Sequence, residues 1–222
     1  MPDPQVRSRF VDPAIAEYAA RHTTPPDPVQ VDLRARTLDR YPDAAGMQVG
    51  DDQFVLLEVL ARATGARSVV EVGTFTGHSS LALARGVGPE GRLLCCDVSE
   101  EWTALARDAW RAAGVEDRIE LRIGPALDTL RSLPADVRFD LAFVDADKPG
   151  YVDYYRELMP RLRPGGLLVA DNTLMGGGVL DGDRAEGNAA AIHAFNEVVA
   201  ADPTVVTVLL PFADGLTLVQ RR

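Results

Sequence analysis

The sequence lacks the residues that cross-link a chain or anchor it in a membrane. Its 222 residues include two cysteines, the adjacent Cys95 and Cys96. Neighbours in a strand point to opposite faces of a sheet, so we expect two buried, inert thiols rather than a disulfide, which fits a reducing cytoplasm. No apolar run approaches the roughly 18 residues that indicate a membrane helix, and the N-terminal MPDPQVRSRF contains no apolar signal core. The sequence therefore predicts a cytoplasmic protein without a membrane segment.

Positive charge is also scarce. The 23 Lys and Arg residues face 33 Asp and Glu residues, which gives a formal net charge of -10. A surface of this sign repels the phosphates of nucleic acids and anionic lipid headgroups, so we expect a small-molecule partner, with no nucleic acid and no membrane. Lysine itself is almost absent, since 22 of the 23 basic residues are Arg and only Lys148 is a lysine.

The chain has the length and composition of one domain with one substantial core. Residues 1–46 read as a helical appendage, in which Pro25, Pro26 and Pro28 separate two possible helices, 12–22 and 29–40. The core begins near residue 47. The segment 51–66 predicts its first helix, with an Asp in the N-cap position, apolar residues on one face and a Gly at the end.

Beyond this helix, short apolar runs alternate with amphipathic segments, which predicts an α/β fold with a doubly wound, Rossmann-like sheet. The expected strands are 68–72, 92–96, 119–123, 141–144 and 167–170, and the expected helices are 79–85, 101–113, 126–132, 151–162 and 189–201. The tail, TVVTVLLPFADGLTLVQRR, contains two strands joined by too short a link for a crossover helix, so they must be antiparallel neighbours. Together these segments predict a seven-stranded mixed sheet with helices on both faces.

Polar residues follow most of the predicted parallel strands, at the sheet edge where ligands bind in doubly wound folds. The first strand leads into a turn that runs from Glu71 through Gly73 to Gly77, and Asp97 follows the second strand. A dinucleotide site is one interpretation, and a tight turn without a ligand is another. However, the GxGxxG pattern is absent, and a carboxylate before the turn disfavours a pyrophosphate. S-adenosylmethionine carries a sulfonium and an ammonium group and no phosphate, so it tolerates Glu71 well.

Three oxygen-bearing side chains, Asp145, Asp171 and Asn172, follow the fourth and fifth strands. Such a set suits a hard divalent cation that keeps waters for a substrate to displace. Asp and Asn also serve as helix caps and turn residues, and this alternative stays open on the pattern alone. Lys148 favours a catalytic site, because a lysine can release its proton and act as a general base, whereas arginine cannot. The alternative is a single surface lysine retained by chance.

Other conspicuous residues have plainer interpretations. The histidines, His22, His78 and His193, lack metal-ligand spacing, and only His78 is near enough to the site to remain a candidate. Trp102 and Trp110 are expected in the core or at an interface rather than as a stacking platform. The glycine-rich segment 175–188 is either a connector or, given its position after Asn172, a mobile loop that gates the substrate.

With these residues in view, the chain resembles the cation-dependent class I O-methyltransferases, the group that includes the caffeoyl-coenzyme A and catechol enzymes and their bacterial relatives. The likeness covers roughly residues 47–222. Its motifs occur in order and at family spacing: MQVGDDQ, VVEVGTFTGHSSLALA, CCDVSEEW, GPALDTL, FDLAFVDADKPGYVDYY, LRPGGLLVADNTLMGGGV and DGLTLVQRR. No motif of residues 1–46 aligns.

The resemblance implies the strand order 3-2-1-4-5-7-6, with the last strand antiparallel, in a single methyltransferase domain whose residues 47–222 bind S-adenosylmethionine. It also implies a homodimer in which residues 1–46 cap the substrate or contact the partner. The implied cofactor contacts are Val49, Glu71, Gly73, Thr74, Ser79, Asp97, Ala126 and Asp145. The implied metal ligands are Asp145, Asp171 and Asn172, for Mg²⁺ or alternatively Mn²⁺ or Ca²⁺. Catalysis falls to Lys148 as the base, with Asp145 and Asn172.

These expectations predict methylation of a hydroxyl on a small molecule, with a catechol-type phenol as the first choice and a hydroxylated secondary metabolite as the second. Two adjacent hydroxyls would chelate the cation, which lowers a phenol pKa that is otherwise about 10.

Two rival functions remain. One is a nicotinamide-dependent oxidoreductase, which the missing GxGxxG disfavours, and the other is a non-catalytic module that binds the cofactor, which the four polar residues Asp145, Lys148, Asp171 and Asn172 disfavour.

Overall fold

Helices and strands alternate along residues 10–222, the part of the chain that the computed structural model describes. The α-helices are α1 (Pro13–Arg21), α2 (Pro28–Arg40), α3 (Asp51–Ala63), α4 (His78–Gly86), α5 (Glu100–Ala112), α6 (Ala126–Ser132), α7 (Tyr151–Leu158) and α8 (Gly187–Ala200). The strands are β1 (Ser68–Val72), β2 (Arg92–Asp97), β3 (Ile119–Ile123), β4 (Phe139–Val144), β5 (Leu162–Asp171), β6 (Val205–Leu210) and β7 (Leu216–Arg221). Short 3-10 helices are η1 (Ala45–Met47), η2 (Glu116–Arg118), η3 (Lys148–Gly150), η4 (Met159–Arg161) and η5 (Met175–Arg184).

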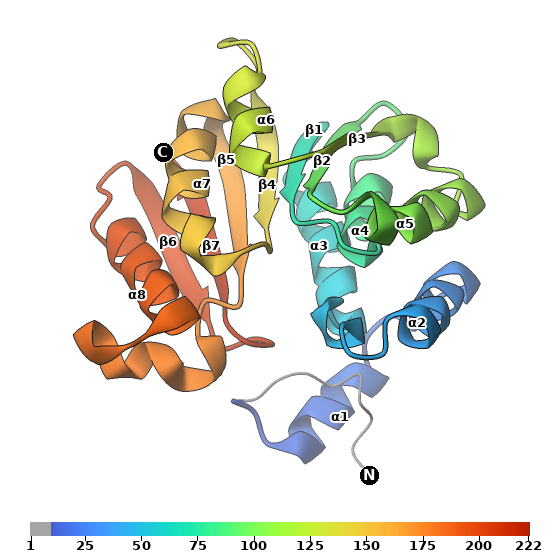
Figure 1. The fold of residues 1–222 in the computed structure, drawn as a ribbon, viewed down its shortest axis with the longest axis horizontal. Coiled ribbons are helices and arrows are strands. Elements are labelled where there is room, and N and C mark those ends of the chain that lie inside the picture. The colour runs from blue at the N-terminus through green and yellow to red at the C-terminus, as the bar shows by residue number, and fades with distance from the viewer. Residues whose placement is uncertain (1–9) are drawn as a thin grey trace.

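The strands form one seven-stranded sheet in the order β3-β2-β1-β4-β5-β7-β6 (Figure 1). Strands β1 to β5 pair in parallel, and β7 is antiparallel to both β5 and β6. This confirms the expected order and the antiparallel last strand. The two strands of the tail, β6 and β7, are antiparallel neighbours, as expected. Because β7 inserts between β5 and β6, only β7 is reversed, and β6 runs in the direction of the parallel strands.

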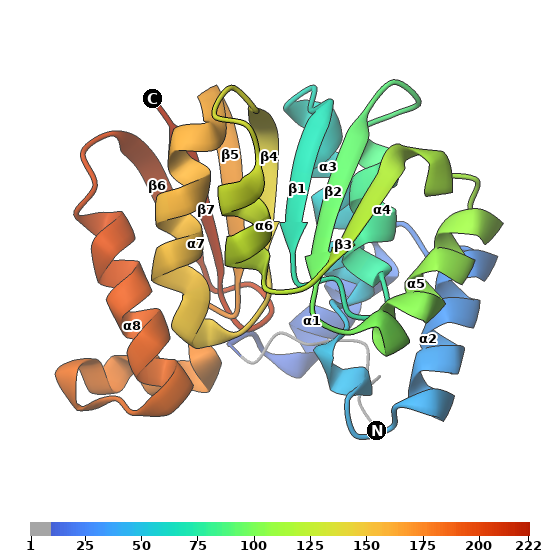
Figure 2. The same ribbon diagram turned by 45° about the horizontal axis from the view of Figure 1, so that its top comes forward.

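Helices cover both faces of the sheet (Figure 2). One apolar cluster joins α6, α7 and α8 to the sheet and includes Tyr151 and Phe195, and the other joins α3, α4 and α5 to the opposite face and includes Trp110. Cys95 and Cys96 are free and buried, and they lie in different clusters. Their opposite orientation in β2 therefore confirms the expected absence of a disulfide between them.

Several element boundaries differ from the sequence prediction. Helix α3 begins at Asp51 with Gly50 as its N-cap, so the expected Asp cap is wrong by one position. Asp51 and Asp52 lie in the first turn instead, where their negative charge interacts favourably with the positive end of the helix dipole. Helix α7 ends at Leu158 rather than 162, because Pro160 lies in the following 3-10 turn and lacks an amide proton. Strand β5 begins at Leu162, five residues before the expected start, and its pairing with β4 shifts register between Phe139 and Leu141.

The two helices expected in the N-terminal appendage are present as α1 and α2. Asp27 forms a capping box with Gln30 at the start of α2, and Leu33 of this helix is buried against Leu105 and Ala109 of α5. Residues 1–9 of the predicted appendage lie outside the described residues. Across the described range, no helix has the length and hydrophobicity required to span a bilayer.

Candidate active site

A cavity of about 1150 Å³ opens at the carboxyl ends of the parallel strands. Figure 2 shows the arrowheads of β1 and β2 pointing toward this edge of the sheet, on the side where α1 lies. The segments that follow β1, β2, β4 and β5 all contribute to its wall, together with residues 46–49 before α3. This is the crevice in which doubly wound sheets bind their ligands.

The turn after β1 is shaped by two glycines with positive φ. Gly73 has φ +91, and a Cβ there would lie 1.9 Å from the carbonyl oxygen of Asp145, so only glycine allows the ends of β1 and β4 to approach this closely. Gly77 has the same φ, and its Cβ would lie 2.5 Å from the Cβ of Ala106. The turn therefore lies close against both β4 and α5 as it enters α4.

Asp97 holds the same turn from the end of β2. Its Oδ2 accepts hydrogen bonds from the backbone N–H groups of Thr74 (2.9 Å) and Phe75 (2.7 Å), and its Oδ1 accepts one from Ser99 N–H (2.8 Å). The carboxylate also lines the cavity. Since each carboxylate oxygen has two acceptor positions, Oδ1 keeps one position for a hydroxyl group of a ligand.

The cavity wall brings together most of the residues expected to contact the cofactor: Val49, Gly73, Thr74, Ser79, Asp97, Ala126 and Asp145. Glu71 is the exception, because its side chain is fully buried in β1 and is not part of the wall. The side chains of Ser79, Thr74 and Cys95 lie beside its carboxylate, but none makes a hydrogen bond of close geometry to either oxygen. Burial raises the pKa of Glu71 to about 7, and the nearby Ser79, Thr74 and Cys95 side chains partly oppose this rise.

The three residues expected to hold a cation all line the cavity. Asp171 is 3 % exposed, and burial together with the charge of Asp145 raises its pKa to about 7. Asn172 has φ +57, a left-handed conformation that Asn tolerates better than most residues, and its N–H donates to Asp171 Oδ1 over 2.7 Å. The set consists of two carboxylates and one amide. Within residues 10–222 no cluster of three or more His, Cys, Asp or Glu side chains suited to a metal occurs.

Lys148 lies on the same wall at the start of η3. Its Nζ donates to Asp145 Oδ1 over 3.0 Å and to Tyr151 Oη over 2.7 Å, and its side chain is 11 % exposed. The Tyr151 hydroxyl in turn donates to the backbone carbonyl of Asp171 over 3.0 Å. One lysine is thereby connected to the ends of both β4 and β5.

Some residues of the site were missed or misjudged from sequence. Trp110 is buried in the core as expected, but Trp102 lines the cavity and packs edge-on against Phe75, so the prediction is wrong for Trp102. The fully buried Tyr151, which contacts Lys148, had no distinctive sequence signal beyond its spacing of three residues from it.

His78 is buried and lines the cavity, with Nδ1 3.1 Å from the carbonyl oxygen of Val49. Met175 of the glycine-rich segment also reaches the cavity, and gating by this segment stays a prediction.

Comparison with known proteins decides the family. A family model described as O-methyltransferase matches residues 21–222. The chain belongs to the O-methyltransferase family. The match starts within α1, so the family likeness includes much of the appendage in which no motif could be aligned.

Individual relatives of this O-methyltransferase agree in length and fold. "Probable caffeoyl-CoA O-methyltransferase 2" of Dictyostelium discoideum is 37% identical over 94% of this chain and 91% of its own length. The O-methyltransferase TomG of Streptomyces achromogenes, solved in complex with SAM, has a TM-score of 0.84 and 31% identity over 94% of this chain and 96% of its own. An O-methyltransferase of Bacillus cereus in complex with SAH has a TM-score of 0.85 and 29% identity, covering 94% of this chain and 97% of its own.

Proposed function

We propose that this protein uses S-adenosylmethionine and a bound divalent cation to methylate a hydroxyl group on a small molecule, with a catechol-type phenol as the acceptor. The observation that carries the proposal is one cavity whose wall contains a glycine turn, two carboxylates on adjacent strand ends and the chain's only lysine. Family membership supplies the reaction class, and the side chains of the cavity supply its details.

The character of the cofactor follows from the charges around the glycine turn. Glu71 is a fully buried carboxylate, and Asp97 presents a second carboxylate to the cavity. A positively charged, phosphate-free cofactor such as S-adenosylmethionine matches this environment, whereas a pyrophosphate does not. TomG and the B. cereus enzyme, which are similar over nearly the whole chain, are solved with SAM and SAH. In this proposal Glu71 and Ser79 hold the methionine end, Asp97 the ribose and Ala126 the adenine side.

The cation would be held by Asp145, Asp171 and Asn172. The donor set fits, because Asp145, Asp171 and Asn172 line one cavity and hard cations prefer carboxylate and amide oxygens. Burial and the charge of Asp145 both raise the pKa of Asp171, and a bound cation would offset these two effects. Mg²⁺ is the first choice, with Mn²⁺ or Ca²⁺ as alternatives. A bound cation would coordinate adjacent hydroxyls of the acceptor and lower their pKa from the phenol value of about 10.

Lys148 acts as the general base of the proposed reaction. Its Nζ faces the cavity at the edge that carries Asp145, Asp171 and Asn172, and the two hydrogen bonds to Asp145 and Tyr151 fix its direction. Removal of the hydroxyl proton makes the acceptor oxygen anionic, and the remaining task of the protein is to hold this oxygen in line with the methyl group. The neutral amine of Lys148, the form that a cation bound at Asp145 would favour, takes up the proton, and the methyl group forms a bond to oxygen as its bond to sulfur breaks.

The charge of the cavity wall supports an acceptor without phosphate groups. Its acidic side chains are Asp97, Asp145, Asp147, Asp171 and Asp214, and within the described chain Lys148 is the only Lys or Arg on the wall. A coenzyme A thioester brings several phosphate charges that this wall repels. A neutral or cationic catechol therefore fits better, with a hydroxylated secondary metabolite as the second choice.

Two rival functions define the outcomes of a binding experiment. Calorimetry measures the affinity for S-adenosylmethionine with and without Mg²⁺. The protein is then incubated with free catechols, catechol amines and a catechol thioester of coenzyme A, and mass spectrometry detects any added methyl group. Metal-dependent methylation of a free catechol supports the proposal. Cofactor binding without methylation of any catechol moves the acceptor to a hydroxylated secondary metabolite, and no methylation of such metabolites either indicates a non-catalytic module. Binding of NAD(P)H in place of S-adenosylmethionine indicates an oxidoreductase. The expected homodimer is measured by light scattering on the same sample, and the expected cytoplasmic location by cell fractionation.

A further inference from the structure

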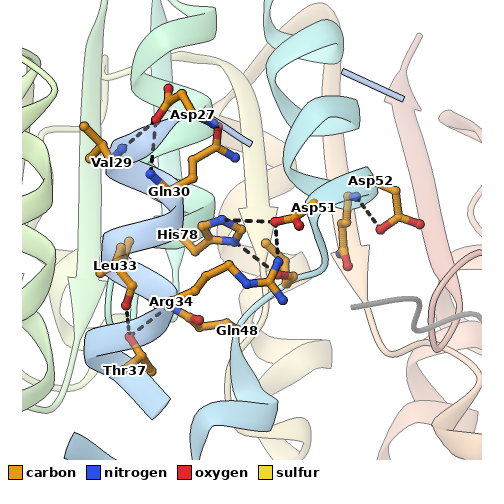
Figure 3. Close-up of polar contacts among 12 residues, drawn as sticks. Asp27, Val29, Gln30, Leu33, Arg34, Thr37, Gln48, Asp51, Asp52 and His78 are labelled. Atoms are coloured by element: carbon orange, nitrogen blue, oxygen red, sulfur yellow. Dashed lines mark hydrogen bonds and ion pairs between the residues drawn. The ribbon is translucent and has the colours of Figure 1, made fainter. Parts of the chain in front are cut away.

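Helix α2 has no residue on the cavity wall, yet its side chains form hydrogen bonds with two segments that do line it. The first segment is residues 47–50, from the last residue of η1 to the start of α3, and the second is the glycine turn 73–77 after β1. Figure 3 shows Arg34 and Thr37 on α2 facing Gln48, Asp51 and His78. The two segments belong to different parts of the chain, and α2 is hydrogen-bonded to both at the point where Gln48 of one meets Thr76 of the other.

The central contact is a buried triangle of polar side chains that we call the Thr37 triangle, formed by Thr37, Gln48 and Thr76. Gln48 Nε2 donates to Thr37 Oγ1 over 3.0 Å and to Thr76 Oγ1 over 2.8 Å, and the two hydroxyl oxygens are 3.0 Å apart. Thr37 and Thr76 are fully buried and Gln48 is 6 % exposed. The hydroxyl of Thr37 also contacts the carbonyl of Leu33 over 2.8 Å, so no oxygen of either threonine is left without a partner.

A second contact ties α2 to the same region. Arg34 forms an ion pair with Asp51, the first residue of α3, and both side chains are mostly buried. The His78 ring lies close to this pair, with Nε2 3.8 Å from Asp51 Oδ1 and Nδ1 3.1 Å from the Val49 carbonyl oxygen. The segment 48–51 is therefore held to α2 at both of its ends.

The Thr37 triangle has consequences for cofactor binding because of where its three corners lie. Gln48 precedes Val49, and Thr76 lies between Thr74 and Gly77, so two corners belong to segments that contact the cofactor in the proposed function. Only Thr37 comes from outside these segments. Removing its hydroxyl would leave a buried Gln48 N–H without an acceptor, and the two segments could restore the bond only by shifting relative to each other.

We propose that Thr37 is a positioning residue for the methyl donor: through Gln48 and Thr76 it holds the segment 47–50 and the glycine turn at the separation that cofactor binding requires. Helix α2 then belongs functionally to the cofactor site, in addition to any role as a substrate cap. The inference rests on the proposed function for the identity of the ligand. By linkage, a cofactor that stabilises this arrangement also stabilises α2, although α2 does not touch the cavity.

The first experiment measures S-adenosylmethionine affinity and steady-state kinetics for three variants. Thr37→Val removes the hydroxyl at nearly constant volume and should raise the Kd for S-adenosylmethionine about tenfold, the effect of one buried donor left without a partner, while kcat at saturating cofactor changes less than about twofold. Thr37→Ser keeps the hydroxyl and should bind within about twofold of the wild type. Thr103→Val is the matched control, because Thr103 is equally buried and its hydroxyl bonds only within its own α5 helix, to Ser99 and Glu100 carbonyls.

The second experiment measures amide hydrogen exchange, and its first comparison uses the wild-type protein alone, so it does not depend on whether a variant folds. Addition of S-adenosylmethionine should slow amide hydrogen exchange in α2, and Thr37→Val should reduce this effect while protection of the glycine turn remains. Unchanged exchange in α2 on cofactor binding, a wild-type Kd in Thr37→Val, or an equal loss in Thr103→Val would each overturn the inference and leave the proposed function intact. Failure of the wild-type protein to bind S-adenosylmethionine at all would overturn both.

Discussion

Lys148 and Asp145 form an ion pair on the cavity wall, with Nζ 3.0 Å from Oδ1. Both side chains are mostly buried, and Tyr151 contacts the same Nζ over 2.7 Å. A flexible lysine that is fixed by two partners has lost much of its rotamer freedom before a substrate arrives, which is the state that a catalytic group requires. This geometry leads to the first prediction.

Replacement of Lys148 by Arg should abolish most turnover although the positive charge remains. An arginine keeps its proton in proteins, and loss of a general base costs about 10² to 10⁴ in rate. We expect kcat to fall at least about a hundredfold with the Kd for S-adenosylmethionine nearly unchanged, measured by calorimetry and by methyl transfer to a catechol. Arg67→Lys, a change at an exposed position, serves as the control. An active Lys148→Arg enzyme would exclude a role for Lys148 as the base.

Removal of the cation or of one of its ligands should have matching effects. Treatment with EDTA, or the substitution Asp171→Asn, should lower methyl transfer about a hundredfold or more, because a bound cation contributes several kcal/mol to such reactions. Added Mg²⁺ should restore the EDTA-treated wild type but not the variant. Thermal unfolding confirms that the variant is folded. Full activity in metal-free buffer would show that the cavity carboxylates have another purpose.

Glu71→Gln should make the ligand-free protein more stable at alkaline pH. The pKa of Glu71 is raised from 4.5 to about 7, so the folded state keeps a proton that the unfolded chain releases between these values. Ionisation of Glu71 therefore costs stability as pH rises through this range, and the full cost, on the order of 3 kcal/mol, is present above it. The variant should gain this amount at pH 8 and nothing near pH 4, as measured by urea unfolding across pH.

The same substitution should weaken S-adenosylmethionine binding, about tenfold by calorimetry, because the buried carboxylate balances the positive cofactor. Glu90→Gln, at an exposed position, should show neither effect. A stability gain that does not depend on pH, or an unchanged cofactor affinity, would contradict the assigned role of Glu71.

Gly73→Ala should be far more damaging than Gly88→Ala. Both glycines have positive φ, but a Cβ at Gly73 would lie 1.9 Å from a backbone oxygen, whereas nothing lies within 4 Å of one at Gly88. The strained backbone alone costs about 1 kcal/mol, and the clash adds about 2 kcal/mol or more together with displacement of the cofactor turn. Chemical denaturation and cofactor titration measure both effects. Equal losses in the two variants would show that the close approach of β1 and β4 is not required.

Much of the fold could be predicted from local patterns. The strands 68–72 and 119–123 and the helix 126–132 match the structure residue for residue, because apolar periodicity and turn residues mark their ends. The start of β5 was misplaced, because the strand pairs with β4 at Leu162, shifts register over the next four residues and pairs again from Leu167, where the apolar run begins. The insertion of β7 between β5 and β6 came from the family likeness, because chain order does not reveal spatial order in a sheet.

The residues of the candidate site likewise fall into those that the sequence could predict and those that it could not. Asp97, Asp145 and Asp171 could be selected because each follows an apolar strand, and parallel strands bring their carboxyl ends to one edge. The position of Trp102 on the cavity wall and the contacts of Tyr151 could not be predicted from the sequence. Nothing in the local sequence distinguishes these two residues from ordinary core aromatics.

The sequence by itself determined the alternation of strands and helices, the acidic charge and the identity of the polar residues at the strand ends, since each of these is a property of neighbouring residues. The tertiary structure alone decided which distant residues meet. It buried Glu71 beside Thr74, Ser79 and Cys95, linked Lys148 to the ends of two strands and brought Thr37 of α2 against Thr76 of the glycine turn. The physical reason is that burial and hydrogen-bond geometry depend on the packing of elements far apart in the chain, and periodicity carries no record of that packing.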